Sequence, residues 1–78
     1  MSKKNNPKIH NFNLGNEDFI ELFKLLKLLN LVGSGGEAKG LIDEGFVKMN
    51  GVTETRKRAK VRADDTVEIQ DNLIRIGK

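Results

Sequence analysis

The chain has 78 residues, a formal net charge of +3 and no cysteine. A chain of this length forms a single domain with a small core, which excludes a deep substrate cavity between domains. The absence of cysteine excludes disulfides and thiolate metal sites, and it fits the reducing cytoplasm, where we expect this protein to act.

No segment is suited to membrane insertion or secretion. The longest apolar-rich segment, residues 19–32, contains three charged residues, so it cannot span a bilayer. Residues 1–8 are polar and lack the apolar run of a signal peptide. We expect a flexible N-terminal arm over 1–8, a single domain over 9–78, and no membrane partner.

The basic character of the chain is local. From Lys48 to Arg62 six basic residues stand against one acidic residue, Glu54, so this segment carries +5 and the rest of the chain sums to −2. A local basic patch on a small domain favours a polyanionic partner, with nucleic acid first and an anionic membrane surface second.

The first half of the domain indicates one short strand and one helix. Apolar alternation from Phe12 onward predicts an edge strand over 9–14, in which we read His10 as a solvated side chain. Asn16 is a good N-cap, and the apolar residues that follow at helical spacing predict a helix over 17–30. The wide apolar face of this helix predicts packing against both the sheet and a second helix.

The second helix has clear signals at both ends. Ser34 followed by Glu37 forms the S-x-x-E pattern of a capping box, and Gly45 is a natural C-terminal stop. Gly36 and Gly40 lie away from the apolar stripe, although a glycine inside a helix costs about 1 kcal/mol relative to alanine. They fit either a phosphate backbone that approaches the helix start or tolerated surface glycines.

The rest of the chain predicts strands joined by tight turns. Residues 46–49 read as a strand, and Asn50-Gly51 is a strong signal for a two-residue hairpin turn. Thr55–Arg62, T-R-K-R-A-K-V-R, is the basic run; it breaks apolar alternation, so we expect a loop or an edge strand anchored by Val61. Asp64-Asp65 then forms a turn before the last hairpin.

Side-chain matching places this last hairpin in a register. With Asp71-Asn72 as the turn, Ile69 faces Ile74 on the core side. On the other side Glu68 faces Arg75 as an opposite-charge pair, and a shift by one residue would destroy the match.

The sequence lacks the residues for catalysis. A nucleophile with its base, a metal centre or a tuned carboxylate pair needs partners that one histidine and no cysteine do not supply. The acidic pairs lie at helix ends and turns, and the S-G-G-E helix start lacks the lysine and hydroxyl of a P-loop. We expect no enzyme, no metal and no cofactor. No phenylalanine interleaves with the basic run, so a bound nucleic acid would be read by its phosphates and shape.

The ordered pattern S-x-x-x-A-K-x-L-I-x-x-G-x-V-x-M-N-G, followed by a basic stretch and D-x-V-x-I, resembles the ribosomal S4-type RNA-binding domain, or alpha-L motif. The resemblance covers residues 17–69 and is closest to stand-alone bacterial proteins of this type. It implies an α+β fold with two short helices packed on a small, mainly antiparallel sheet of about four strands. It also implies structured RNA, ribosomal or transfer, as the partner, and association with the ribosome or its subunits. Many members have an arginine directly after the serine, where this chain has Gly35.

We therefore expect a monomer with a two-part RNA surface, formed by the basic run and the start of the second helix. The candidate RNA-binding residues are Lys27, Gly35, Gly36, Lys39, Lys48, Asn50, Arg56, Lys57, Arg58, Lys60 and Arg62. If three to five phosphates are neutralised, log K should fall against log salt with a slope of about −2 to −4.5. The alternative is a protein-interaction adaptor that docks an acidic partner on the basic run, with Phe46 or Leu28 exposed and dominating the binding energy.

Overall fold

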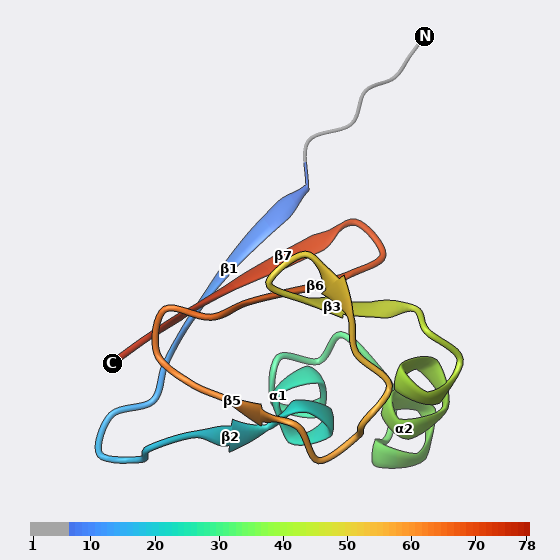
Figure 1. Ribbon diagram of the computed structural model, residues 1–78, viewed down its shortest axis with the longest axis horizontal. Helices are drawn as coiled ribbons and strands as arrows, with labels where there is room; N and C mark the ends of the chain where they lie inside the picture. Colours follow the sequence, from blue (N-terminus) through green and yellow to red (C-terminus); the bar gives the residue numbers. More distant parts are fainter. Residues whose placement is uncertain (1–6) are drawn as a thin grey trace, which may run out of the picture.

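The computed structural model describes residues 7–78, over which nine helices and strands follow one another (Figure 1). They are β1 (Lys8–Asn13), β2 (Ile20–Glu21), α1 (Leu22–Leu28), α2 (Gly35–Asp43), β3 (Val47–Met49), β4 (Val52–Thr53), β5 (Lys60–Val61), β6 (Thr66–Ile69) and β7 (Asn72–Gly77). Of the predicted arm, residues 1–6 lie outside the described part of the chain, and strand β1 already begins at Lys8. Neither helix of the described chain has the length and apolar character to cross a membrane.

The strands form two sheets. Five strands lie in the order β1-β7-β6-β3-β4, and β2 pairs with β5 in a separate two-stranded sheet. Strand β1 is parallel to β7, whereas the other pairs are antiparallel. The predicted α+β class with two short helices is confirmed. The main sheet has five strands rather than about four, and the basic run contributes to a small sheet of its own.

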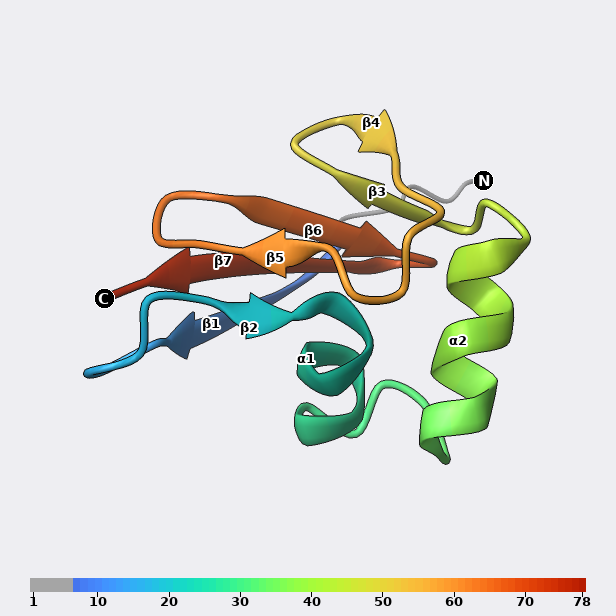
Figure 2. The same ribbon diagram turned by 60° about the horizontal axis from the view of Figure 1, so that its bottom comes forward.

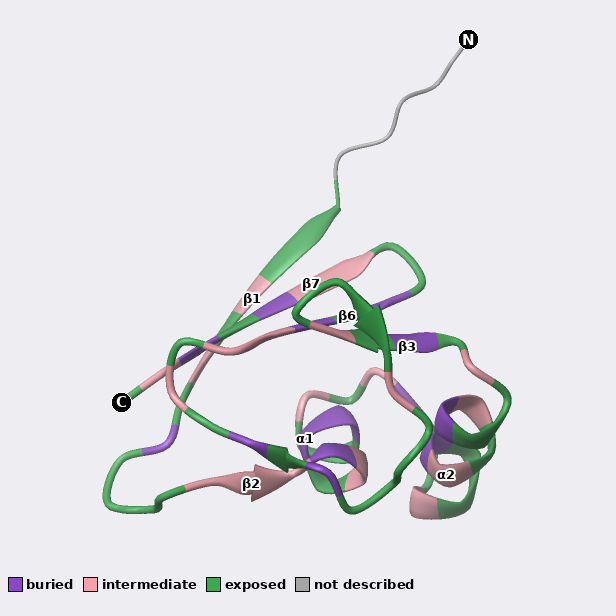
Figure 3. Cartoon of the chain, in the orientation of Figure 1, coloured by how far each residue is buried: buried purple, intermediate pink, exposed green. Residues whose placement is uncertain are grey.

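The core lies between two layers. The five-stranded sheet forms one layer, and both helices and the small sheet cover one of its faces (Figure 2). Buried residues occur in both layers, on the two helices and β5 and on the strands β3, β6 and β7 (Figure 3). The fully or almost fully buried large side chains are Leu22, Leu25, Leu26, Ile42, Val47, Val61, Val67, Ile69 and Ile74. Burial of each such side chain contributes about 1.5–3 kcal/mol, so this cluster is the main source of stability.

Helix α1 begins later than predicted. It spans Leu22–Leu28 rather than 17–30, and Asn16 is not its cap. The N-cap is Glu21, which makes no side-chain cap hydrogen bond. The preceding residues Ile20 and Glu21 are extended because they pair with β5, far along the chain. A periodic apolar pattern cannot reveal such a distant partner, so it placed these residues in the helix.

Helix α2 has the predicted limits. The Ser34 hydroxyl accepts a hydrogen bond from the Glu37 N–H at 3.1 Å, and the Glu37 carboxylate accepts one from the Gly33 N–H. The helix ends at Asp43, and Gly45 follows with φ of +85°, a left-handed conformation that glycine adopts without strain.

The predicted turn at Asn50-Gly51 is also confirmed. Both residues have positive φ, 54° and 84°, as two-residue hairpin turns require. Met49 of β3 lies opposite Val52 of β4. The turn therefore fixes the direction in which the chain enters the basic run.

The last hairpin has a different register from the predicted one. Val67 faces Ile74 and Ile69 faces Asn72, so the turn lies at Gln70-Asp71. The predicted pairing of Ile69 with Ile74 is therefore wrong. Because the shift moves the partners by two residues, the apolar side chains still point into the core.

Because of the same shift in register, the predicted pair of Glu68 with Arg75 on the outer side does not form. Glu68 faces Leu73, and Arg75 faces Thr66. Asn72 belongs to β7, where its amide lies 3.0 Å from His10 Nε2 and donates to the Ile69 carbonyl at 3.3 Å. His10 is thus half-buried between strands rather than solvated as expected.

Candidate nucleic-acid interface

The backbone of the basic run is tied to the start of α1. The Leu22 N–H donates to the Ala59 carbonyl at 2.9 Å, and the Phe23 N–H donates to the Lys57 carbonyl at 3.1 Å. The first N–H groups of a helix lack partners within the helix, so these bonds satisfy α1 and fix the basic run together. Ala59 and Val61 are buried and anchor the run to the core. The basic side chains of the run remain exposed.

A carboxylate clamp fixes the far end of the run. Asp65 accepts hydrogen bonds from the Arg62 backbone N–H at 2.7 Å and from the Asn50 side-chain amide at 3.0 Å. The Asn50 carbonyl oxygen in turn accepts from the Thr66 N–H at 2.9 Å. The Asn50 side chain therefore joins the β3–β4 turn to the segment after the basic run. This bonding gives Asn50 a structural role beside the RNA contact predicted for it.

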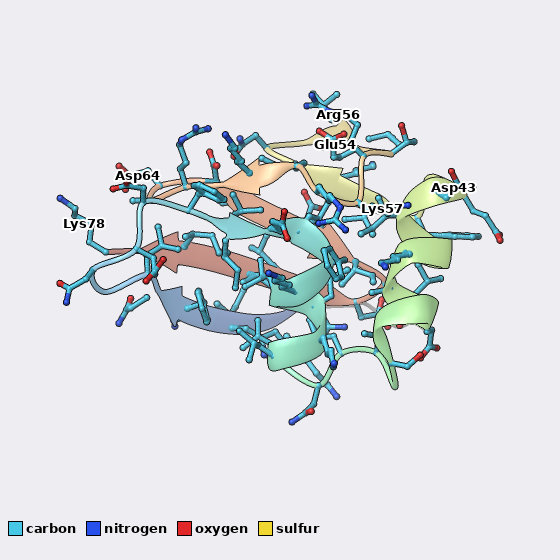
Figure 4. The ribbon with its side chains drawn as sticks, turned by 90° about the horizontal axis from the view of Figure 1, so that it is seen from below. Asp43, Glu54, Arg56, Lys57, Asp64 and Lys78 are labelled. Carbon is cyan, nitrogen blue, oxygen red and sulfur yellow. The ribbon has the colours of Figure 1, made fainter. Side chains whose placement is uncertain are left out.

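One groove lies between α2 and the basic run, and we call it the helix groove. Its volume is about 640 Å³. It is lined by Lys39, Gly40, Asp43, Thr55, Arg56, Lys57 and Arg58. Lys57 lies on the α2 side of the run, whereas Arg56 lies with Glu54 near β4 (Figure 4). Four of the seven lining residues are basic and one is acidic, so the groove favours an anion.

A second groove lies between the basic run and the β3 side of the sheet, and we call it the hairpin groove. Its volume is about 660 Å³. It is lined by Met49, Arg56, Arg58, Ala59, Lys60, Arg62 and Asp65. Its one acidic residue, Asp65, is already engaged by the clamp. Since Arg56 and Arg58 line both grooves, the basic run is a ridge with a cationic groove on each side.

Two phenylalanine rings support the cations. The Phe23 ring has Lys39 Nζ at 5.0 Å and Arg58 Cζ at 5.7 Å from its centroid. Lys60 Nζ lies 5.0 Å from the Phe19 centroid. Such cation–π contacts hold a charge in place without neutralising it, at about 0.5–1 kcal/mol each when exposed. The sequence predicted Phe23 only as a helix-face residue, because nothing local shows that the basic run crosses over it.

Two of the arginines also have carboxylate partners. Arg56 Nε lies 3.0 Å from Glu54 Oε2, and its backbone N–H donates to the same oxygen at 2.9 Å. These hydrogen bonds and the charge of the guanidinium lower the pKa of Glu54 below its usual range. Glu21 Oε2 lies 3.5 Å from Arg58 Nη1, and Glu21 Oε1 lies 3.3 Å from Lys24 Nζ. Arg58 is therefore positioned by Glu21 at one end and by the Phe23 ring beneath it.

The structure brings only part of the predicted set together. Lys39 and the five cations of the basic run line the two grooves, whereas Gly35 and Gly36 in the first turn of α2 line neither. Lys27 lines a separate hollow on α1, beside the exposed Leu28. Lys48 alternates with the buried Val47, so it lies on the outer face of the sheet, opposite Glu68. The RNA contacts of all eleven candidate residues remain predictions, and these four residues lie outside both grooves.

Two short helices on a mixed sheet, with a cationic ridge beside them, define a small α+β domain whose surface favours a polyanion. The family model of the S4 domain matches residues 12–77. The chain therefore belongs to the S4 domain family, as the resemblance predicted.

Particular relatives agree with this assignment. YbcJ of Escherichia coli (strain K12), named for a proposed role in RNA binding, is 43% identical over 65 residues, which cover 83% of this chain and 93% of that protein. The YbcJ protein of Shigella flexneri matches with the same identity and coverage. The solution structure of the E. coli protein, described as revealing an alpha-L motif involved in RNA binding, superposes with a TM-score of 0.70 at 37% identity, over 100% of this chain and 96% of that one. The chain thus has the alpha-L RNA-binding motif.

Proposed function

We propose that this protein is a non-catalytic RNA-binding protein that recognises structured RNA, ribosomal or transfer, and acts on the ribosome or its subunits in the cytoplasm. The observation that carries the proposal is the ridge: five cations on a backbone held by α1, by two buried anchors and by the Asp65 clamp. A fixed row of cations suits a fixed row of phosphates, because little side-chain and backbone freedom is lost on binding.

Structured RNA is favoured over an unpaired strand by the state of the two aromatic rings beside the ridge. Single-strand binders stack bases on free aromatic faces. Here Phe23 lies beneath Lys39 and Arg58, and Phe19 lies beneath Lys60. Recognition by phosphate position and helix shape is what the remaining side chains support.

The proposal is tested by titrating the protein with an RNA hairpin, a DNA duplex of the same sequence and acidic lipid vesicles at one salt concentration. We expect the hairpin to bind tightest, with a log–log salt slope of about −2 to −4.5. A salt-independent affinity, or tighter binding to DNA or vesicles, would overturn the proposal. Crosslinking in cells followed by sequencing of the bound RNA would then identify the RNA.

The residues are tested by amide chemical shifts during titration with the hairpin. We expect the largest shifts at Lys39 and along residues 55–62. Changes confined to the β6–β7 hairpin would contradict this placement. A comparison of Lys39→Gln with Lys27→Gln separates the two helices: only the first residue lines a groove of the ridge, so only that variant should weaken binding clearly.

A protein-interaction adaptor is the second candidate, and one observation favours it. Leu28 and Phe46 are 61% and 57% exposed, as that alternative requires. Neither residue lines the helix groove or the hairpin groove. Recovery of a protein partner that survives nuclease treatment and is lost in Leu28→Ser or Phe46→Ser would favour the adaptor.

A further inference from the structure

The helix groove and the hairpin groove lie on opposite sides of the same ridge, and each groove has its own outer wall. The wall of the helix groove is α2, at Lys39, Gly40 and Asp43, whereas the hairpin groove is bounded by Met49 and Asp65. Lys57 lines only the helix groove, and Lys60 lines only the hairpin groove. The basic residues of the ridge therefore face two adjoining hollows of similar size, one on each side of the ridge.

This arrangement is poorly matched to a single RNA strand. One sugar–phosphate backbone can lie in only one groove at a time, so two of the six cations that line the grooves would stay unpaired. An A-form RNA stem, in contrast, presents two backbones on either side of a wide and shallow minor groove that exposes 2′-hydroxyl groups. A narrow ridge with a cationic groove on each side complements that surface.

We infer that the ridge lies along the minor groove of an RNA stem, with one strand in the helix groove and the opposite strand in the hairpin groove. The inference rests on the proposed function and names the RNA element that this surface takes. Lys39 and Lys57 contact phosphates of the first strand, and Lys60 and Arg62 contact phosphates of the second. Arg58 lies between the strands, where its guanidinium can donate to 2′-hydroxyl oxygens.

The environment of Arg58 suits this central position. Glu21 and the Phe23 ring hold the guanidinium of Arg58, which lines both grooves. Arg56 occupies the other shared position, where Glu54 already offsets part of its charge. An arginine whose charge is partly offset fits a position above the groove floor better than one against a phosphate.

The chain contains no cysteine, so a single introduced cysteine gives one defined attachment point for a cleavage probe. Lys57→Cys and Lys60→Cys form a matched pair, since each removes one lysine of the same run and each lies in one groove only. An iron chelate that generates hydroxyl radicals is attached to each cysteine. Each protein is then bound to an RNA stem built from two separate strands, with each strand end-labelled in turn. Glu68→Cys, on the outer face of the sheet and outside the candidate RNA-binding set, is the control.

We expect the probe at position 57 to cut one strand and the probe at position 60 to cut the opposite strand, at nucleotides facing each other across the minor groove. The control should cut neither strand above background. The unlabelled protein should bind the stem at least tenfold more tightly than either strand alone.

Cleavage of the same strand by both probes would overturn the inference while RNA binding itself stood. Absence of cleavage by both probes, with the stem still protected by the unlabelled protein, would overturn it as well, because the grooves would then hold no backbone. Failure of the unlabelled protein to bind any stem would overturn the proposed function together with the inference.

Discussion

Asp65 links three segments, so its removal should be the most costly single change on the surface of this protein. In Asp65→Ala the Arg62 N–H and the Asn50 amide lose their shared acceptor. Hydrogen bonds to a charged acceptor contribute about 1.5–3 kcal/mol each when well shielded, and less where water can replace them. Because both bonds lie near the surface, we expect a total loss of about 2–3 kcal/mol in the free energy of unfolding.

Urea and thermal unfolding measure this loss directly. For a domain of this size each kcal/mol lowers the melting temperature by about 4–8 °C, so the variant should melt roughly 10–20 °C lower. Asp65→Asn keeps one acceptor oxygen and should lose about half as much. Asp64→Asn removes a negative charge at the neighbouring residue but keeps both hydrogen bonds to Asp65, so it should change the free energy of unfolding little. If Asp65→Ala and Asp64→Asn behaved alike, the clamp would have no energetic role and the reasoning would be refuted.

Three further changes test the helix ends and the charge on the ridge. Ser34→Ala removes the cap of α2 and should lower the unfolding free energy by about 1 kcal/mol, measured as a lower urea midpoint with an unchanged slope; an unchanged midpoint would contradict the cap. Gly45→Ala forces alanine to a φ of +85°, at a cost of about 1–2 kcal/mol in the same assay. The added Cβ meets Thr53 only at 3.6 Å, so strain is the cause, and a stabilised variant would contradict it. Glu54 has a lowered pKa, so its pair with Arg56 stabilises the fold above the usual carboxyl pKa and is lost as the pH falls through the lowered one. Glu54→Gln should therefore flatten the acid limb of the stability profile and, by removing a negative charge beside the ridge, tighten RNA binding; weaker RNA binding would argue against this.

The elements that the sequence predicted well are those whose causes are local. The cap at Ser34, the stop at Gly45 and the turn at Asn50-Gly51 each depend on the backbone preferences of one or two residues, and all three are confirmed. The inward anchoring of the basic run at Val61 is confirmed for a similar reason, since Val61 is its one large apolar side chain.

The elements that were missed depend on distant partners. The start of α1 is set by pairing with β5, and the register of the last hairpin differs because Asn72 enters β7 and meets His10 of β1. The same limit applies to the site. Charge alone located the basic run, but only the fold shows that it is a ridge between two grooves and that Phe23 lies beneath Arg58.

The parallel pairing of β1 with β7 has a consequence for the way the chain folds during synthesis. The first and the last strand of the described chain are neighbours in the sheet, so β1 cannot pair until β7 has been synthesised. Contacts between distant parts of a chain slow folding, because the loop between them must be closed before the contact forms. The segment from α1 to β5, which builds the ridge, closes over a shorter stretch of chain. We therefore expect the cationic surface to be organised on the nascent chain before the sheet that supports it is complete.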